Sequence, residues 1–202
     1  MTGAATIAGG FAETGAGAWL AARGQPAAFC GATTRRRRKG WIVRDRARLE
    51  HVETSGPAKF SISSRPFLTH VQCAAPVSAV SSKVLVAPLQ AHAGSEMLKP
   101  IPMGVRGAIC VSRFDKEWVV LATVSRTTRM VVEDGETLSV RPEAAVAWTG
   151  GRPTGFCPKI GVLDMLLPRG PRNLLLHFHG PCIVWAEGAP EIVPCAAGRR
   201  VF

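Results

Sequence analysis

Two histidines separated by one residue are the sharpest chemical feature of this 202-residue chain. Residues 173–179 read Asn-Leu-Leu-Leu-His-Phe-His, an apolar run typical of a β-strand. Residues two apart on a strand point to the same face, so the imidazoles of His177 and His179 would lie side by side. Imidazole nitrogens are common ligands of zinc and similar divalent metals. The pair is a candidate metal site, and two plain surface histidines, or a pair facing a neighbouring subunit, are the alternative.

The remaining ligands of such a site are only half present. The arrangement resembles that of cupins, which bind a metal inside a double-stranded β-helix through a glycine, a His-x-His motif and a following acid. Six residues separate Gly170 from His177, but Ile183-Val184 stands where the acid is expected and Glu187 lies further along the chain. A cupin-like metal-binding enzyme using His177 and His179 is therefore an alternative function.

Other combinations of reactive residues give weaker patterns. Cys182 follows the histidine pair and could complete a His/His/Cys site, although a buried structural thiol is the simpler role. Ser112, Asp164 and His177 supply the residue types of a catalytic triad without any nucleophile-elbow motif. The acids of 133–136 gather in one predicted turn, as solvated carboxylates do. The sequence therefore favours a protein without catalytic residues and without a cofactor.

One run of cations could bind a polyanion. It consists of Arg35, Arg36, Arg37, Arg38 and Lys39, and Trp41 follows it closely. Adjacent cations neutralise phosphates and an aromatic side chain can stack on a base, so RNA is one candidate partner. An anionic membrane is an equal candidate, because each cation near such a surface gains about 1 kcal/mol.

The positive charge is concentrated near the N-terminus. The formal net charge is +11, and residues 35–59 hold nine Lys or Arg against three acids. Residues 1–34 are mostly small. Few acids, small hydroxylated residues and a later arginine cluster are typical of an organellar transit peptide. We therefore predict a disordered basic leader over 1–57, a β domain over 58–195 and a tail over 196–202. The predicted location is mitochondrial, with the plastid or cytoplasm as alternatives.

The rest of the chain predicts an all-β fold. Short apolar runs are bounded by Pro and Gly, and no long stretch has helical periodicity. The predicted strands are Phe67–Cys73, Lys83–Leu89, Gly107–Arg113, Trp118–Val124, Thr128–Val132, Thr137–Arg141, Ala145–Trp148, Ile160–Leu167, Asn173–His179 and Cys182–Ala186. Many short strands at regular spacing indicate a sandwich or barrel-like roll.

Local patterns add detail to this prediction. The run Trp118–Val124 is apolar enough to be buried on both faces, and Thr128–Val132 is expected to return antiparallel beside it. Glu133-Asp134-Gly135 predicts a tight turn in which Gly135 adopts positive φ. Pro142 cannot donate to a sheet ladder, so we expect it at a strand end or an edge.

The stretch between Gly135 and Trp185 resembles a known family. The matching positions are Gly135, Glu136, Val140, Pro142, Val146, Ala147, Trp148, Gly180, Pro181, Val184 and Trp185. The pattern is similar to that of the altered inheritance of mitochondria protein 24 family, which carries a tryptophan-RNA-binding-attenuator-like domain. The resemblance implies a shortened double-stranded β-helix, or β-roll, of two stacked copies, here with an abbreviated first copy. It carries over no catalytic residues.

We therefore expect a non-enzymatic structural or assembly module. The resemblance implies sheets that pack into larger assemblies, so the expected partner is a second copy of the chain or another assembly protein. Trp148 and Trp185 are candidate packing anchors. Association of the family with mitochondria implies a role in inner-membrane organisation, with peripheral membrane binding. An RNA-binding module remains a further alternative.

Overall fold

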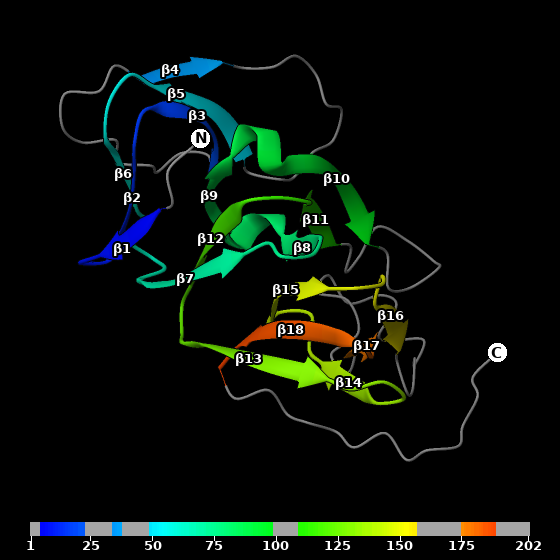
Figure 1. Cartoon of the computed structure of the whole chain (residues 1–202). Helices are drawn as coiled ribbons and strands as arrows, with labels where there is room; N and C mark the ends of the chain where they lie inside the picture. Colours follow the sequence, from blue (N-terminus) through cyan, green and yellow to red (C-terminus); the bar gives the residue numbers. More distant parts are fainter. Residues whose placement is uncertain (1–4, 23–33, 38–48, 99–108, 157–174, 189–202) are drawn as a thin grey trace, which may run out of the picture.

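The computed structural model describes residues 5–22, 34–37, 49–98, 109–156 and 175–188, which form four antiparallel sheets (Figure 1). Sheet A, in the order β1-β2-β6, contains β1 (Thr6–Ala8), β2 (Phe11–Thr14) and β6 (Ala58–Phe60). Sheet B, in the order β4-β5-β3-β9-β12-β7, contains β4 (Thr34–Arg37), β5 (Leu49–Thr54), β3 (Gly17–Ala22), β9 (Val84–Pro88), β12 (Trp118–Thr123) and β7 (Phe67–Gln72).

The two remaining sheets are sheet C, with six strands, and sheet D, with three. Sheet C, in the order β10-β11-β8-β15-β18-β13, contains β10 (His92–Leu98), β11 (Ile109–Phe114), β8 (Val77–Val80), β15 (Ala145–Thr149), β18 (Cys182–Glu187) and β13 (Thr127–Val132). Sheet D, in the order β14-β17-β16, contains β14 (Thr137–Val140), β17 (Leu175–His179) and β16 (Thr154–Phe156). Two short 3-10 turns, η1 (Ser81–Lys83) and η2 (Leu89–Ala91), flank β9. In the described part of the chain, no helix is long and apolar enough to span a membrane.

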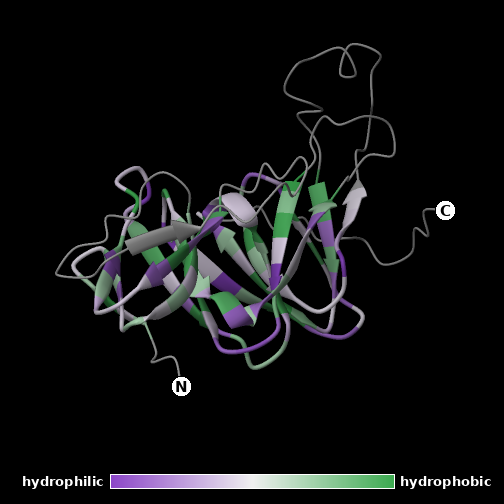
Figure 2. Ribbon diagram, turned by 90° about the horizontal axis from the view of Figure 1, so that it is seen from above, coloured by the Kyte–Doolittle hydropathy of each residue, from purple (hydrophilic) through white to green (hydrophobic). Residues whose placement is uncertain are grey.

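Three clusters of buried side chains fix the order of the layers as A, B, C and D. Trp19 of sheet B packs with Phe60 of sheet A, and Leu121 of sheet B packs in one cluster with Trp185 of sheet C. Trp148 of sheet C packs against Phe178 of sheet D, with ring centroids 5.4 Å apart. Sheets B and C are therefore buried on both faces. Hydrophobic residues accordingly concentrate along the strands, while the connecting loops are more hydrophilic (Figure 2).

The first five residues of strand β12 are all apolar. Trp118, Val120 and Ala122 point into the cluster between sheets A and B. Val119 and Leu121 point into the cluster between sheets B and C. Successive side chains of a strand alternate between the two faces, so a strand with both faces covered is apolar except where a polar side chain is hydrogen-bonded, as Thr123 is to the carbonyl of Ser125. The prediction that this run is buried on both faces is confirmed for residues 118–123 and wrong for Val124, which is 64% exposed.

The chain interlocks sheets B and C. Between residues 67 and 132 it passes from β7 in sheet B to β8 in sheet C, back to β9, on to β10 and β11, back to β12 and finally to β13. The two sheets are therefore joined by several covalent connections of the same chain. The two six-stranded sheets therefore belong to one folding unit.

The predicted all-β class is confirmed. Each predicted strand that falls on described residues overlaps an observed strand, while Ile160–Leu167 lies outside them. Gly135 has φ of 80° in the turn between β13 and β14, and Pro142 lies in the connection between β14 and β15, as predicted. The strands β1 to β6, β8, β10 and β16 were not predicted.

The glycine of the Gly180-Pro181 pair is required by a close backbone approach. Its amide donates to the carbonyl of Glu136, at 3.1 Å. A Cβ atom built on Gly180 would lie 1.8 Å from the carbonyl oxygen of Glu133. The β17–β18 connection, which contains a cis bond before Pro181, therefore packs directly on the turn that follows β13.

The predicted leader is wrong for the residues that the structure describes. Strand β3 pairs with both β5 and β9 in the interior of sheet B. Trp19 of this strand is fully buried, and its indole nitrogen donates to Thr54 Oγ1 at 2.9 Å. Residues assigned to a disordered leader thus supply strands and core side chains, so the boundary at 57 is incorrect. The predicted tail at 196–202 lies outside the described residues.

The predicted partner of Thr128–Val132 is also wrong. Strand β13 pairs with β18 in sheet C, not with β12 in sheet B. Both edges of β12 are already occupied, by β7 and β9. The chain leaves β12 at a bend around Val124 and Ser125 and enters the next layer.

Candidate functional site

The two histidines lie on the outer face of sheet D. Leu176 and Phe178 of β17 point into the core shared with sheet C, so His177 and His179 point to the opposite face. In the register of β14 and β17, Ser139 stands opposite His177 and Thr137 opposite His179. The sequence correctly placed both imidazoles on one face.

Hydroxyl groups orient both rings. Ser139 Oγ lies 2.8 Å from His177 Nδ1, and Thr137 Oγ1 lies 3.0 Å from His179 Nδ1. Thr154 Oγ1 of β16 lies 3.3 Å from His179 Nε2. Burial lowers the pKa of His177, and the nearby charge of His179 lowers it further. The neutral imidazole of His177 is therefore favoured, which suits hydrogen bonding as well as metal binding.

The predicted companions of the histidines point elsewhere. Cys182 is buried in the core between sheets C and D, on the other side of sheet D from the histidines. Burial raises the pKa of its thiol, so it is a structural group. Glu187 is bound to Lys83, as described below. Among the described residues, no three His, Cys, Asp or Glu side chains are grouped to hold a metal ion, and catalytic zinc sites have three protein ligands.

The triad suggested by residue types is not assembled. Ser112 is fully buried on the face of sheet C that points away from sheet D, so sheets C and D separate it from His177. Asp164 lies outside the described residues. Ser112 belongs instead to a chain of hydroxyls that was not predicted: Ser81 Oγ lies 2.8 Å from its Oγ, and Ser95 Oγ lies 3.1 Å away on the other side.

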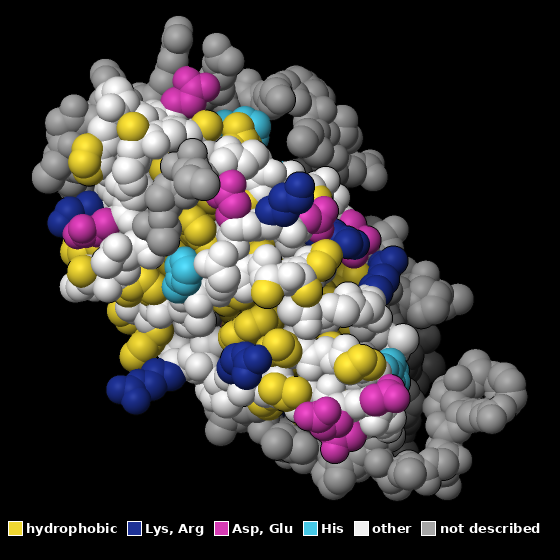
Figure 3. All heavy atoms as spheres, in the orientation of Figure 1, with side chains coloured by type: hydrophobic (Ala, Val, Ile, Leu, Met, Phe, Trp, Pro, Cys, Tyr) yellow, Lys and Arg dark blue, Asp and Glu magenta, His cyan; other side chains and the backbone are white. Residues whose placement is uncertain are grey.

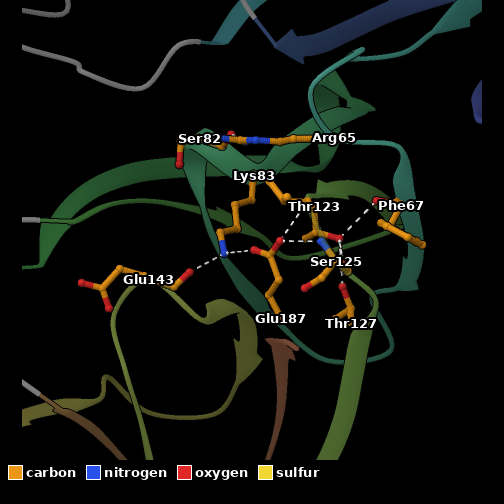
Figure 4. A network of polar contacts seen from close by, with 10 residues as sticks. Arg65, Phe67, Ser82, Lys83, Thr123, Ser125, Thr127, Glu143 and Glu187 are labelled. Carbon is orange, nitrogen blue, oxygen red and sulfur yellow. Dashed lines mark hydrogen bonds and ion pairs between the residues drawn. The ribbon is translucent and has the colours of Figure 1, made fainter. Parts of the chain in front are cut away.

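The most extensive polar cluster of the described residues joins sheets B and C (Figure 4). Lys83 Nζ donates to Glu187 Oε2 and to the carbonyl of Glu143, both at 2.6 Å. Glu187 Oε1 accepts from the backbone amides of Val124, at 2.5 Å, and Ser125, at 2.8 Å. We call this set the Lys83–Glu187 network. It fixes the bend through which the chain passes from β12 to β13.

The charge state of Glu187 follows from these contacts. Burial, the largest single effect, favours the protonated acid and opposes ionisation. The hydrogen bonds from Lys83, Ser125 and Val124 and the Lys83 charge outweigh it together, so the pKa of Glu187 is lowered. The side chains of Lys83 and Glu187 are only 11% and 15% exposed. An ion pair so far from solvent and so well bonded is a structural clamp, not a substrate site.

The basic run is partly built into the fold. Arg35, Arg36 and Arg37 lie in β4 at one edge of sheet B, with Arg35 in register with Glu53 of β5. Arg38 and Lys39 lie outside the described residues. The sequence suggested that this basic run belongs to a separate leader, but part of it forms a strand of sheet B.

The two tryptophans proposed as packing anchors are core residues. Trp148 is 2% exposed and Trp185 is 9% exposed. Each lies in a cluster between two sheets of the same chain. They stabilise the layers and cannot serve as contact residues for a second subunit without unfolding.

Edges of the two large sheets provide a surface that the sequence did not reveal. Strands β7 and β13 are the last strands of sheets B and C, and both flank the bend after β12. Phe67, Val124 and Val131 are 40%, 64% and 52% exposed there, and they are three of the four large apolar side chains exposed in the described residues. Figure 3 shows apolar side chains gathered over β7 and β13, with basic side chains beside them. We call this surface the β7–β13 edge.

Comparisons with known proteins give the fold and no more. No family model matches the chain, and no curated protein matches its sequence. The crystal structure of protein SPYM3_0169 from Streptococcus pyogenes matches with a TM-score of 0.67 at 10% sequence identity. The match covers 89% of this chain and 88% of the streptococcal chain. The two proteins share a fold. At this identity the likeness carries over no site residue and no activity.

Proposed function

We propose that this protein is a non-enzymatic assembly module that associates through the free edges of its sheets. The observation that carries the proposal is the β7–β13 edge, where the last strands of two sheets and the bend beside them expose three large apolar side chains. Natural β-proteins usually protect sheet edges with charge, proline or a covering segment, because a free edge pairs readily with another chain. An edge with exposed Phe67 and Val131 favours association.

The polar groups of the described residues support the same proposal. Lys83 and Glu187 neutralise each other and bind backbone groups. Ser112 is engaged by two other serines. His179 is within hydrogen-bond distance of hydroxyls at both ring nitrogens. These groups stabilise the fold, and an edge surface needs no catalytic residue.

The family resemblance extends the proposal to a place in the cell. It suggests assembly at an organelle inner membrane, in a mitochondrion. Such targeting would not depend on a leader removed at residue 57, because that cleavage would delete β3 and the buried Trp19. Cell fractionation of a C-terminally tagged full-length chain tests this part: recovery with mitochondrial membranes supports it, and recovery in the cytosol contradicts it.

Assembly itself is tested by measuring mass in solution. Sedimentation velocity of the full-length chain should show a species larger than the 21.5 kDa monomer. Val131→Lys should reduce that species, because a charge on an exposed edge strand opposes strand pairing. Ile7→Lys is the matched control, since Ile7 is an exposed apolar residue of sheet A, 39% exposed. A monomer at all concentrations would contradict the proposal.

A further inference from the structure

The hydrogen bonds between β13 and β18 show which peptide groups of β13 face outward. The amide of Gly188 donates to the carbonyl of Arg126. Residues of an antiparallel strand bond to the neighbouring strand at every second position. Thr128, Met130 and Val132 therefore bond to β18, while the peptide groups of Thr127, Arg129 and Val131 point away from it. Among the described residues β13 pairs with β18 alone, so these groups form an open ladder.

The charges at the two ends of β13 have opposite sign. Arg126 precedes the strand, and the exposed turn of Glu133, Asp134 and Glu136 follows it. A strand with a basic start and an acidic end is complementary to a second copy of itself that runs antiparallel. In such a pairing, each basic end lies against the acidic turn of the other copy.

From this complementarity we propose that two copies of the chain pair antiparallel through β13, with Met130 on the two-fold axis. The outward peptide groups allow registers in which odd-numbered residues face one another. Centring the axis on Arg129 would place two arginines directly opposite, and like charges directly opposite are destabilising. Centring it on Thr128 or on Val131 would leave half of the six-residue strand unpaired. With Met130 on the axis, Arg129 faces Val131 of the second copy and Arg126 faces Asp134.

This register joins two copies of sheet C into one continuous sheet. The inference rests on the proposed function, because it names the partner and the strand through which the module assembles. It also explains the exposure of Val131: at 52% in one chain, this side chain would be covered in part by the neighbouring strand.

A cysteine crosslink tests the register. At a non-hydrogen-bonded antiparallel pair the Cα atoms are about 4.5 Å apart, within the range of about 4.4–6.8 Å that a disulfide spans. Met130→Cys should therefore crosslink two chains under mild oxidation, measured by non-reducing electrophoresis against the parent chain with its own cysteines. Thr128→Cys, on the same face, is the matched control. In the proposed register, the two cysteines at position 128 would lie four residues apart along the paired strands, about 13 Å from each other. They should not crosslink the chains beyond the parent level.

A charge swap tests the same pairing with cysteine chemistry left out. Arg126→Glu and Asp134→Lys should each weaken self-association about tenfold, since each replaces two attractions by two repulsions in a symmetric pair. The double variant should recover most of the affinity. If the parent associates but neither the crosslink nor the recovery is seen, the pairing through β13 is wrong and the proposed function stands. A parent that is monomeric overturns both.

Discussion

The Lys83–Glu187 network gives the sharpest prediction about stability. Glu187, near the end of the described sequence, holds Lys83 of η1 and the amides of Val124 and Ser125 in the β12–β13 bend. These elements carry the chain between sheets B and C. Removing one ionic partner should therefore loosen the junction of the two large sheets without touching any of the three apolar clusters.

The expected cost follows from the burial of the pair. Removing one partner of a fully buried ion pair costs about 3–5 kcal/mol, because the other charge is left unpaired. The side chains here are 11% and 15% exposed, so partial hydration reduces the cost of Lys83→Met to about 2–3 kcal/mol. Glu187→Gln keeps an oxygen that accepts from Val124 and Ser125 and loses only the charged bond to Lys83, so we expect about 2 kcal/mol.

Chemical denaturation of the two single variants and of the double variant measures these values. The double variant should cost less than the sum of the singles by about 1–2 kcal/mol, since the second substitution removes a charge that the first has already left unpaired. Thermal midpoints should fall by about 2–4 °C for each kcal/mol lost. Single variants within about 0.5 kcal/mol of the parent, as is usual for unlinked surface positions, would refute the reasoning.

Four further outcomes are expected. Gly180→Ala should destabilise the fold strongly, since its Cβ would meet the carbonyl oxygen of Glu133 at 1.8 Å; a variant with parental stability would show that the connection can shift. Acid should remove the stability contributed by Glu187: its pKa in the fold lies below the ordinary glutamate value of 4.5, so the contribution is complete at neutral pH and is lost as the pH falls below about 4.5. A Glu187→Gln variant should lose less stability over that range than the parent. The pKa of Cys73 is raised to about 11 by burial and then by the charge of Asp115, so a thiol reagent at neutral pH should modify it only after unfolding. His177 should titrate below 6.5 in an NMR pH series, and a value at or above 6.5 would contradict the burial of its ring.

The strands were predictable from the sequence where both faces are covered. Two-sided burial leaves a continuous apolar run such as residues 118–122, which is easy to recognise. The N-terminal strands escaped prediction because Ala12 and Ala21 look like low-complexity sequence. In the fold these alanines lie fully buried beside Trp19. A run of small residues predicted disorder, but in the fold the small alanine side chains leave room for the indole ring of Trp19.

The polar contacts between distant residues could not be predicted. Lys83 and Glu187 are 104 positions apart, and no spacing rule links them. A lysine next to the apolar run Val84–Pro88 was the available signal, because a buried lysine needs an anionic partner. The histidine pair was placed correctly on one face because the two-residue period of a strand is local. Its hydroxyl partners, Thr137 and Thr154, come from other strands and depend on the register.

The choice of partner for β13 shows the same limit. Consecutive strands usually pair, which favoured a hairpin of β12 and β13. That hairpin is impossible because β7 and β9 occupy both edges of β12. The occupied edges drive β13 into sheet C, and there it becomes the open edge on which the proposed assembly depends.

Sedimentation velocity of the full-length chain beside its Val131→Lys variant tests the central claim most directly. We predict that the parent sediments as a dimer or larger species at concentrations where Val131→Lys is a monomer, while Ile7→Lys behaves like the parent. A parent that remains at 21.5 kDa across a wide range of concentrations would contradict the assembly function.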